Sequence, residues 1–168
     1  MLNADLKQQL KQLLELMESD VEFVASLGSD DKSKELKELL DEIADMSARI
    51  TVTEKDLKRT PSFSVNRPGE ETGVTFAGIP LGHEFNSLVL AILQVSGRAP
   101  KEKQSVIDQI KGLEGPFHFE TFVSLTCQKC PDVVQALNLM SVINPNITHT
   151  MIDGAVFREE SELSLIHI

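Results

Sequence analysis

Two cysteines separated by two residues, Cys127 and Cys130, are the side chains of this sequence best suited to chemistry. An alternating apolar pattern over residues 117–125 predicts a strand directly before them, and Pro131–Ile143 predicts a helix directly after them. The thiolate is the nucleophile in disulfide exchange, and the free N–H groups and dipole of a helix N-terminus favour it. We therefore expect Cys127 to attack a disulfide and Cys130 to resolve the resulting mixed disulfide.

Other interpretations of the cysteine pair remain open. A structural zinc ion needs four ligands, and His118 and His149, the remote candidates, each lie in a strand pattern. The pair could also be inert and structural. Lys129 adds a positive charge that would favour the thiolate, although a solvated surface lysine explains it equally well. The strand–Cys-x-x-Cys–helix context favours redox exchange over zinc or an inert pair.

The composition argues against two classes of binding partner and indicates the cellular compartment. The 168 residues include 26 Asp and Glu against 16 Lys and Arg, which gives a net charge of −10. Nucleic acid and anionic membrane surfaces require clustered basic residues, so neither is expected as a partner. The N-terminus has no basic region followed by an apolar run, and no stretch approaches the ~20 apolar residues of a membrane span. These features predict a cytoplasmic protein, in which a cysteine pair at this spacing is more often catalytic or metal-binding than a structural disulfide.

The elements that must position the cysteines follow an α/β order. Apolar residues recur with helical or strand spacing, and glycine and proline separate the segments. The predicted helices cover residues 3–18, 31–43, 84–95, 101–113 and 131–143, and the predicted strands cover residues 21–27, 50–53, 62–66, 73–79, 117–125 and 147–153.

The order of elements begins again after a break at residues 97–100. Val21 and Phe117 are 96 residues apart, and Ile50 and Ile147 are 97 apart, which indicates an internal duplication. We expect a first unit over residues 1–97 and a second over 98–157. The hairpin and helix that close the first unit have no counterpart after Gly154. Residues 158–168 therefore form a tail that either ends a fragment or is foreign to the parent protein.

Three segments carry a resemblance to a known family: Gly82–Phe85, Cys127–Met140 and Asn144-Pro145. Together they resemble the N-terminal domain of the alkyl hydroperoxide reductase F subunit, over the range Met1 to about Phe157. The resemblance implies an α/β chain of two tandem thioredoxin/glutaredoxin-like folds packed as one domain, the second incomplete at its C-terminal end. It also implies that the first fold is vestigial, because Asp30 and Ser33 stand 97 residues before the two cysteines.

The family resemblance implies a disulfide oxidoreductase. In F subunits a thioredoxin-reductase-like body, which binds FAD and NADH, passes electrons to the N-terminal domain. That domain passes them to the disulfide of a peroxiredoxin, the C subunit. This chain lacks the body and should bind neither cofactor. By position, Cys127 is the attacking thiolate, Cys130 the resolving thiol, and Glu84 an acidic residue that assists proton transfer.

Two alternatives remain open, one for the role of Glu84 and one for the function of the chain. Without the family, Glu84 is interpreted as a carboxylate that favours a helix dipole. The family's Val-Pro segment, whose cis-proline packs against the redox pair, is absent here. A non-catalytic docking module, or an inactive fragment of the reductase, is therefore the alternative function.

Overall fold

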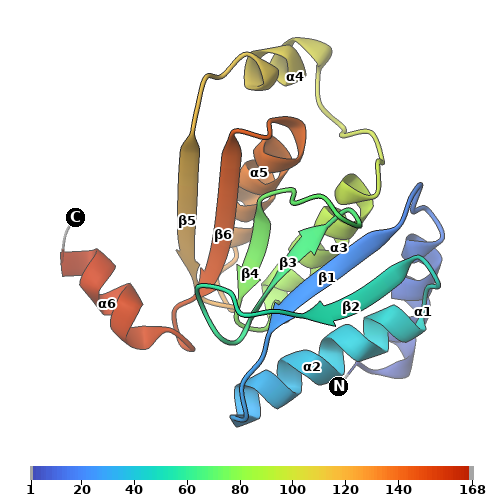
Figure 1. Cartoon of the computed structure of the whole chain (residues 1–168), viewed down its shortest axis with the longest axis vertical. Helices are drawn as coiled ribbons and strands as arrows, with labels where there is room; N and C mark the ends of the chain where they lie inside the picture. The colour runs from blue at the N-terminus through green and yellow to red at the C-terminus, as the bar shows by residue number, and fades with distance from the viewer. Residues whose placement is uncertain (1, 167–168) are drawn as a thin grey trace.

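The computed structural model of the chain describes residues 2–166, which form helices packed on one six-stranded sheet (Figure 1). The strand order is β2-β1-β3-β4-β6-β5. The elements in chain order are α1 (Ala4–Leu14), β1 (Val21–Ser26), α2 (Asp31–Asp45), β2 (Ile50–Glu54), β3 (Ser62–Asn66), β4 (Val74–Ala77), the 3₁₀ helix η1 (Gly82–Glu84), α3 (Phe85–Val95), α4 (Gln104–Lys111), β5 (Phe117–Val123), α5 (Cys130–Ile143), β6 (Ile147–Asp153) and α6 (Arg158–Ile166).

The two halves of the chain share this sheet. β4 from the first half pairs in parallel with β6 from the second, with Phe76 opposite Met151. Among the described strands, only β3 runs antiparallel to its neighbours. Behind the sheet in Figure 1, α3 packs against α5, so helices of both halves also meet. The prediction of two units packed as one α/β domain is confirmed.

The register of the strands repeats between the halves. Val21 of β1 is opposite Ile50 of β2, and Phe117 of β5 is opposite Ile147 of β6. These are the pairs of positions that the sequence offsets align. β1 also pairs with β3, whereas β5 is the last strand of the sheet in the part of the chain that the structure describes. The second half, as far as it is described, therefore lacks the hairpin that completes the first.

The core lies between the sheet and its helices. Three phenylalanines are fully buried there, and the ring of Phe63 lies 5.5 Å from that of Phe23 and 5.4 Å from that of Phe76. The apolar helix faces predicted from the sequence cover them. Their buried members include Leu10, Leu14, Leu36, Leu39, Leu40, Ile43, Leu88, Ile92, Val95 and Val134.

One expectation is wrong: a helix, α6, follows β6, where the sequence pattern suggested none. Glu159 and Glu160 lie in its first turn, where carboxylates favour the helix dipole, and its other residues include good helix formers. A tertiary contact also holds it, because Arg59 donates from Nε to both carboxylate oxygens of Glu160, at 3.1 and 3.0 Å. The start of α6 is thus tied to the fold through Glu160, while residues 167–168 lie outside the described part.

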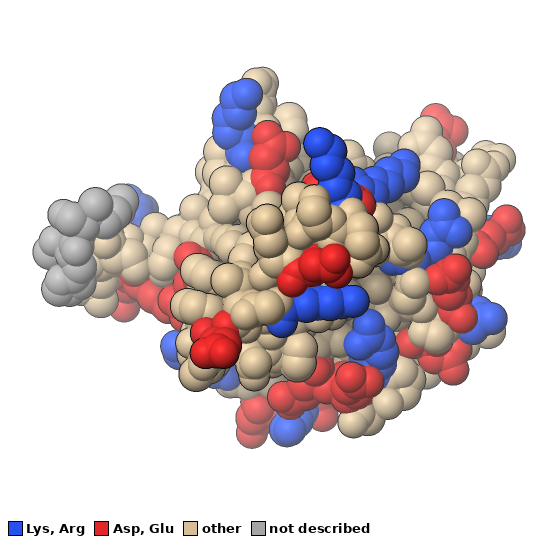
Figure 2. Space-filling model, turned by 90° about the horizontal axis from the view of Figure 1, so that it is seen from above, with Lys and Arg blue, Asp and Glu red and all other residues tan. Residues whose placement is uncertain are grey.

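Charged side chains of both signs lie among uncharged ones on the surface. They are interspersed over the face shown in Figure 2, the usual pattern of a solvated surface. None of the helices within residues 2–166 has the length and apolar character needed to cross a membrane.

Candidate functional site

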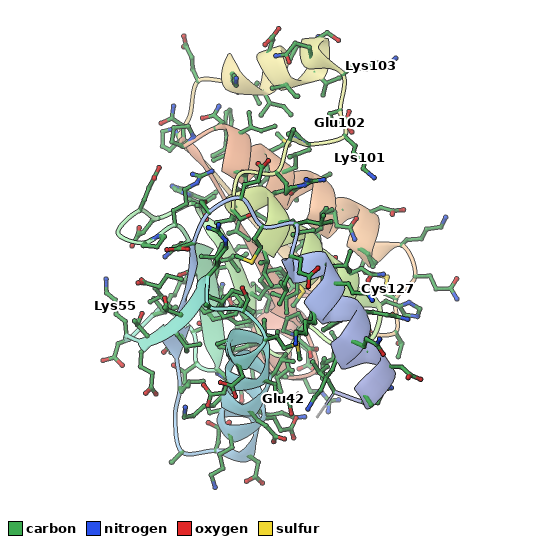
Figure 3. The ribbon with its side chains drawn as sticks, turned by 90° about the vertical axis from the view of Figure 1, so that its right-hand side faces the viewer. Glu42, Lys55, Lys101, Glu102, Lys103 and Cys127 are labelled. Atoms are coloured by element: carbon green, nitrogen blue, oxygen red, sulfur yellow. A yellow bond between two sulfur atoms is a disulfide. The ribbon has the colours of Figure 1, made fainter. Side chains whose placement is uncertain are left out.

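The cysteine pair lies where β5 ends and α5 begins. β5 stops at Val123, a six-residue loop follows, and Cys130 is the first residue of α5. The two cysteines form a disulfide, with their Cα atoms 5.6 Å apart, and both are half-buried. In Figure 3 the labelled Cys127 lies away from the linker residues 101–103, which lead to α4 and the opposite end of β5. The predicted strand–Cys-x-x-Cys–helix placement is confirmed.

The start of α5 presents a hydrogen-bond donor to the leading sulfur. The backbone N–H of Cys130 donates to the Sγ of Cys127 at 3.2 Å. Pro131, directly after it in the first turn, has no N–H to offer. The amide of Cys130 and the helix dipole would therefore stabilise a negative charge on Cys127 in the reduced state. Lys129 is exposed beside the pair and adds positive charge.

Glu84 lies on η1, next to the redox loop. The backbone N–H of His83 donates to the carbonyl of Leu125 at 3.0 Å, and Leu125 is two residues before Cys127. A Cβ on Gly82 would lie 2.8 Å from that same carbonyl, and this residue has a φ of +60°, so glycine allows the close approach. η1 also packs against α5. The first unit therefore brings Glu84 to the end of the sheet that carries the cysteines.

The carboxyl of Glu84 is fully buried, and only one of its two oxygens has a hydrogen-bond partner among residues 2–166. Its Oε1 accepts a hydrogen bond from the Ser87 hydroxyl at 2.8 Å, while its Oε2 is buried without a hydrogen-bond partner among residues 2–166. Burial raises the pKa of Glu84 above its ordinary value, and the bond from Ser87 partly opposes this. A carboxyl in such an environment holds its proton closer to neutral pH than an exposed one, which suits it to proton transfer.

Sequence reasoning missed the residues that hold Glu84. Ser87 lies three positions after Glu84, a helical spacing that was a usable signal. Gln135 on α5 donates from Nε2 to the Ser87 Oγ at 3.2 Å. The 48 residues between Ser87 and Gln135 leave no local pattern that connects them. These bonds join η1, α3 and α5.

The two histidines considered as zinc ligands have other partners. His149 is fully buried, and its Nδ1 lies 2.7 Å from Asn138 Oδ1 and its Nε2 2.8 Å from the Thr121 hydroxyl. An amide oxygen only accepts, so Nδ1 carries the proton and Nε2 accepts from Thr121. Burial lowers the pKa of His149 to about 4. His118 is exposed and bonds to Thr148. Both imidazoles have hydrogen-bonding roles within the sheet and its helices.

A hollow of about 540 Å³ opens beside the redox loop. Leu125 and Thr126 line one side, Gly154 and Ala155 another, and Ser161 of α6 contributes to its wall. In the first unit the Ser26 hydroxyl, at the end of β1, lies 2.6 Å from that of Thr60, which precedes Pro61 in a cis peptide. No X-Pro segment follows β6 among the described residues of the second unit.

Curated relatives of known name match the chain over nearly its whole length. No protein-family profile matches. The chain is 94% identical over 162 residues to the alkyl hydroperoxide reductase F subunit of Staphylococcus epidermidis and 91% identical to that of Staphylococcus aureus. Each match covers 96% of this chain and 32% of the relative. The chain thus spans about a third of the length of these relatives.

Solved structures place the match in one part of that protein. The NTD_N/C domain of alkylhydroperoxide reductase AhpF from Enterococcus faecalis is 33% identical, with a TM-score of 0.91 over 99% of this chain and 86% of that one. The chain belongs to the family of F-subunit N-terminal domains. A protein disulfide oxidoreductase from Aeropyrum pernix, 19% identical with a TM-score of 0.83, shares the fold. The resemblance to this family and the thioredoxin-like fold class are thereby confirmed.

In the first unit of this F-subunit domain, Asp30 and Ser33 occupy the positions that correspond to Cys127 and Cys130. Asp30 caps α2, and its Oδ2 accepts from the backbone N–H of Ser33 at 3.2 Å. The Ser33 hydroxyl donates to Asp30 Oδ1 at 2.6 Å and accepts from the N–H of Gly28 at 2.9 Å. This position therefore carries a hydrogen-bonded cap that is incapable of thiol chemistry.

Proposed function

We propose that this domain is a dithiol–disulfide electron relay to a peroxiredoxin, with Cys127 as the attacking residue and Cys130 as the resolving one. The observation that carries the proposal is the disulfide at the N-terminus of α5, whose leading sulfur accepts the Cys130 N–H at 3.2 Å. Membership in the F-subunit family supports it, since F subunits are named as parts of alkyl hydroperoxide reductase.

The proposed exchange proceeds in two balanced steps. The Cys127 thiolate attacks one sulfur of the partner's disulfide, forms a mixed disulfide and releases the partner's other sulfur as a thiolate. Cys130 then loses its proton, and its thiolate attacks Cys127, which releases the partner's first sulfur. The domain gains one disulfide and the partner gains two thiols, so two electrons pass to the partner.

Glu84 has the proton-transfer role in this proposal. It accepts the proton of Cys130 when the disulfide closes and returns it when the disulfide is reduced. Three observations support the role: η1 lies against α5, the carboxyl is buried, and its Oε2 is free of other partners among residues 2–166. Burial also raises its pKa, which lets the group hold a proton nearer to neutral pH.

The rest of the electron path lies outside this chain in our proposal. A flavoprotein body that binds FAD and NADH reduces the Cys127–Cys130 disulfide, and the peroxiredoxin that accepts the electrons reduces peroxides. The hollow beside Leu125 and Gly154 would admit the partner's cysteine-bearing segment. A dithiol that must be reduced again after each cycle needs a reducing compartment, and the cytoplasm provides one.

Electron transfer to the peroxiredoxin tests the proposal. The reduced 168-residue domain is mixed with the oxidised C subunit, and thiols are counted on both proteins by mass spectrometry. We expect two new thiols on the partner for each disulfide formed here, and none with the Cys127→Ser variant. A partner that binds but stays oxidised would instead support the docking module. The same thiol count on a longer F-subunit chain shows whether any loss of activity in the 168-residue domain comes from its being an inactive fragment.

A further inference from the structure

Two side chains outside the cysteine pair form a hydrogen-bonded line that ends on Glu84. Gln135 Nε2 on α5 donates to the Ser87 Oγ at 3.2 Å, and the Ser87 hydroxyl on α3 donates to Glu84 Oε1 at 2.8 Å. Ser87 is 1% exposed and Glu84 is fully buried, so water does not compete for the bond between them.

The chemistry of the groups fixes the direction of this line. An amide N–H only donates, so the Ser87 oxygen accepts from Gln135 and directs its own hydrogen to Glu84. Glu84 Oε1 is thereby held by a donor, while Oε2 has none among residues 2–166. When the carboxyl is protonated, the proton therefore belongs on Oε2.

We propose that Ser87 and Gln135 are positioning residues of the redox site, which orient Glu84 so that Oε2 is the oxygen that exchanges a proton with Cys130. The inference rests on the proposed function of Glu84. In the step that closes the disulfide, the S–H bond of Cys130 breaks and its proton goes to Oε2. The S–S bond to Cys127 forms as the bond between Cys127 and the partner breaks, and the partner's sulfur leaves as a thiolate.

The same bonds could instead serve only to hold α3 against α5, and the two roles differ in their pH dependence. A positioning role requires that the loss of the Ser87 donor disfavour the charged carboxylate. The titratable or charged groups on the elements around Glu84 are His83 on η1, Lys129 and Asp132 at the start of α5, and the cysteines themselves. α3 carries none between Phe85 and Val95.

The first test is the titration of Glu84 in the oxidised domain, followed by NMR of ¹³C-labelled carboxyls and assigned with Glu84→Gln. We expect the Glu84 pKa to rise in Ser87→Ala and to rise less in Gln135→Met, which keeps the length of the side chain without the donor. Ser141→Ala is the control, because this buried hydroxyl on α5 donates to the carbonyl of Leu137 and not to the line that ends on Glu84. A Glu84 titration that is unchanged in Ser87→Ala overturns the inference.

The second test is the rate at which the reduced domain reduces glutathione disulfide between pH 6 and 9. We expect Ser87→Ala to slow the reaction about fivefold at pH 6, the factor that corresponds to one lost hydrogen bond, and to leave the rate at pH 9 nearly unchanged. In a Glu84→Gln background the same substitution should have no further effect. If Glu84→Gln reacts like the wild type, the proposed role of Glu84 is wrong. If Glu84→Gln is slow but Ser87→Ala is normal, only the positioning inference fails.

Discussion

The backbone N–H of Cys130 donates to the Sγ of Cys127 at 3.2 Å. In the first unit the N–H of Ser33 donates to the carboxylate of Asp30 at the same distance. An aspartate, charged at neutral pH, thus occupies the position that corresponds to the leading cysteine. Each unit thus presents the same backbone amide at the start of a helix to its leading residue, an arrangement that would stabilise a thiolate on Cys127 in the reduced state.

Alkylation rates should separate the two cysteines. After reduction, we expect iodoacetamide at pH 6 to modify Cys127 about tenfold faster than Cys130 or free cysteine, because the helix N-terminus favours the thiolate of the leading residue. Peptide mapping by mass spectrometry measures both sites at once. Equal rates at the two cysteines, or a Cys127 rate no higher than that of free cysteine, would contradict an activated nucleophile.

The Asp30–Ser33 position of the first unit should accept a disulfide. The hydrogen bond from Ser33 to Asp30 reproduces that between the two cysteines, so Asp30→Cys with Ser33→Cys should form an intramolecular bond in air. The test uses a Cys127→Ser, Cys130→Ser background and counts free thiols under denaturing conditions. Asp30→Cys alone, which should keep one free thiol, is the control. Two free thiols in the double variant would show that the two sites are not equivalent in geometry.

Much of the fold and the cysteine site was predictable because local patterns specify them. Period-2 and period-3.6 apolar spacing located β5 and α5, and therefore the position of Cys127 at the helix N-terminus. The offsets of 96 and 97 residues anticipated the repeated pairing of β1 with β2 and of β5 with β6. These features depend on residues near one another in sequence or on a repeated pattern.

The features that sequence reasoning missed are contacts between distant segments. Arg59 meets Glu160 across 101 residues, and Gln135 meets Ser87 across 48. Polar side chains that pair after folding leave no periodic trace, and α6 depends on one of these contacts for its place on the fold. The burial of Glu84 was missed because its helical neighbours do not reveal that η1 lies against α5.

Stability should fall below neutral pH because of His149. Its pKa is about 4 in the folded state against 6.5 in the unfolded chain, so unfolding takes up a proton between these values. The stabilisation is fully present above pH 6.5 and is lost as the pH falls to 4, by at most about 3 kcal/mol.

Urea unfolding of wild type and His149→Gln between pH 7 and 4.5 measures the effect of His149. The difference between the two proteins should shrink as the pH falls. Glu84, whose raised pKa acts in the opposite direction, contributes to both proteins and cancels in that difference. The exposed His118→Gln is the control and should parallel the wild type. A difference that is independent of pH would contradict a neutral, buried His149.

Arg59 should contribute strongly to stability, unlike its neighbour. Its side chain is 8% exposed and donates to Glu120 at 2.9 Å and to Glu160, whereas Lys58 is 76% exposed and lies 3.5 Å from Glu120. We expect Arg59→Met to lower the free energy of unfolding by about 2 kcal/mol and Lys58→Met by less than about 0.5. Urea titrations compare them, and equal losses would show that Arg59 does not anchor α6 to β5.

The central claim is that Cys127 attacks a peroxiredoxin disulfide and Cys130 resolves the product, and a trapped adduct tests it most directly. Cys130→Ser and Cys127→Ser are each reduced, mixed with the oxidised C subunit, and separated on a non-reducing gel with mass spectrometry of the bands. We predict a stable mixed disulfide through Cys127 in Cys130→Ser, and little or none in Cys127→Ser. No adduct with Cys130→Ser, or an equally abundant one through Cys130, would contradict it.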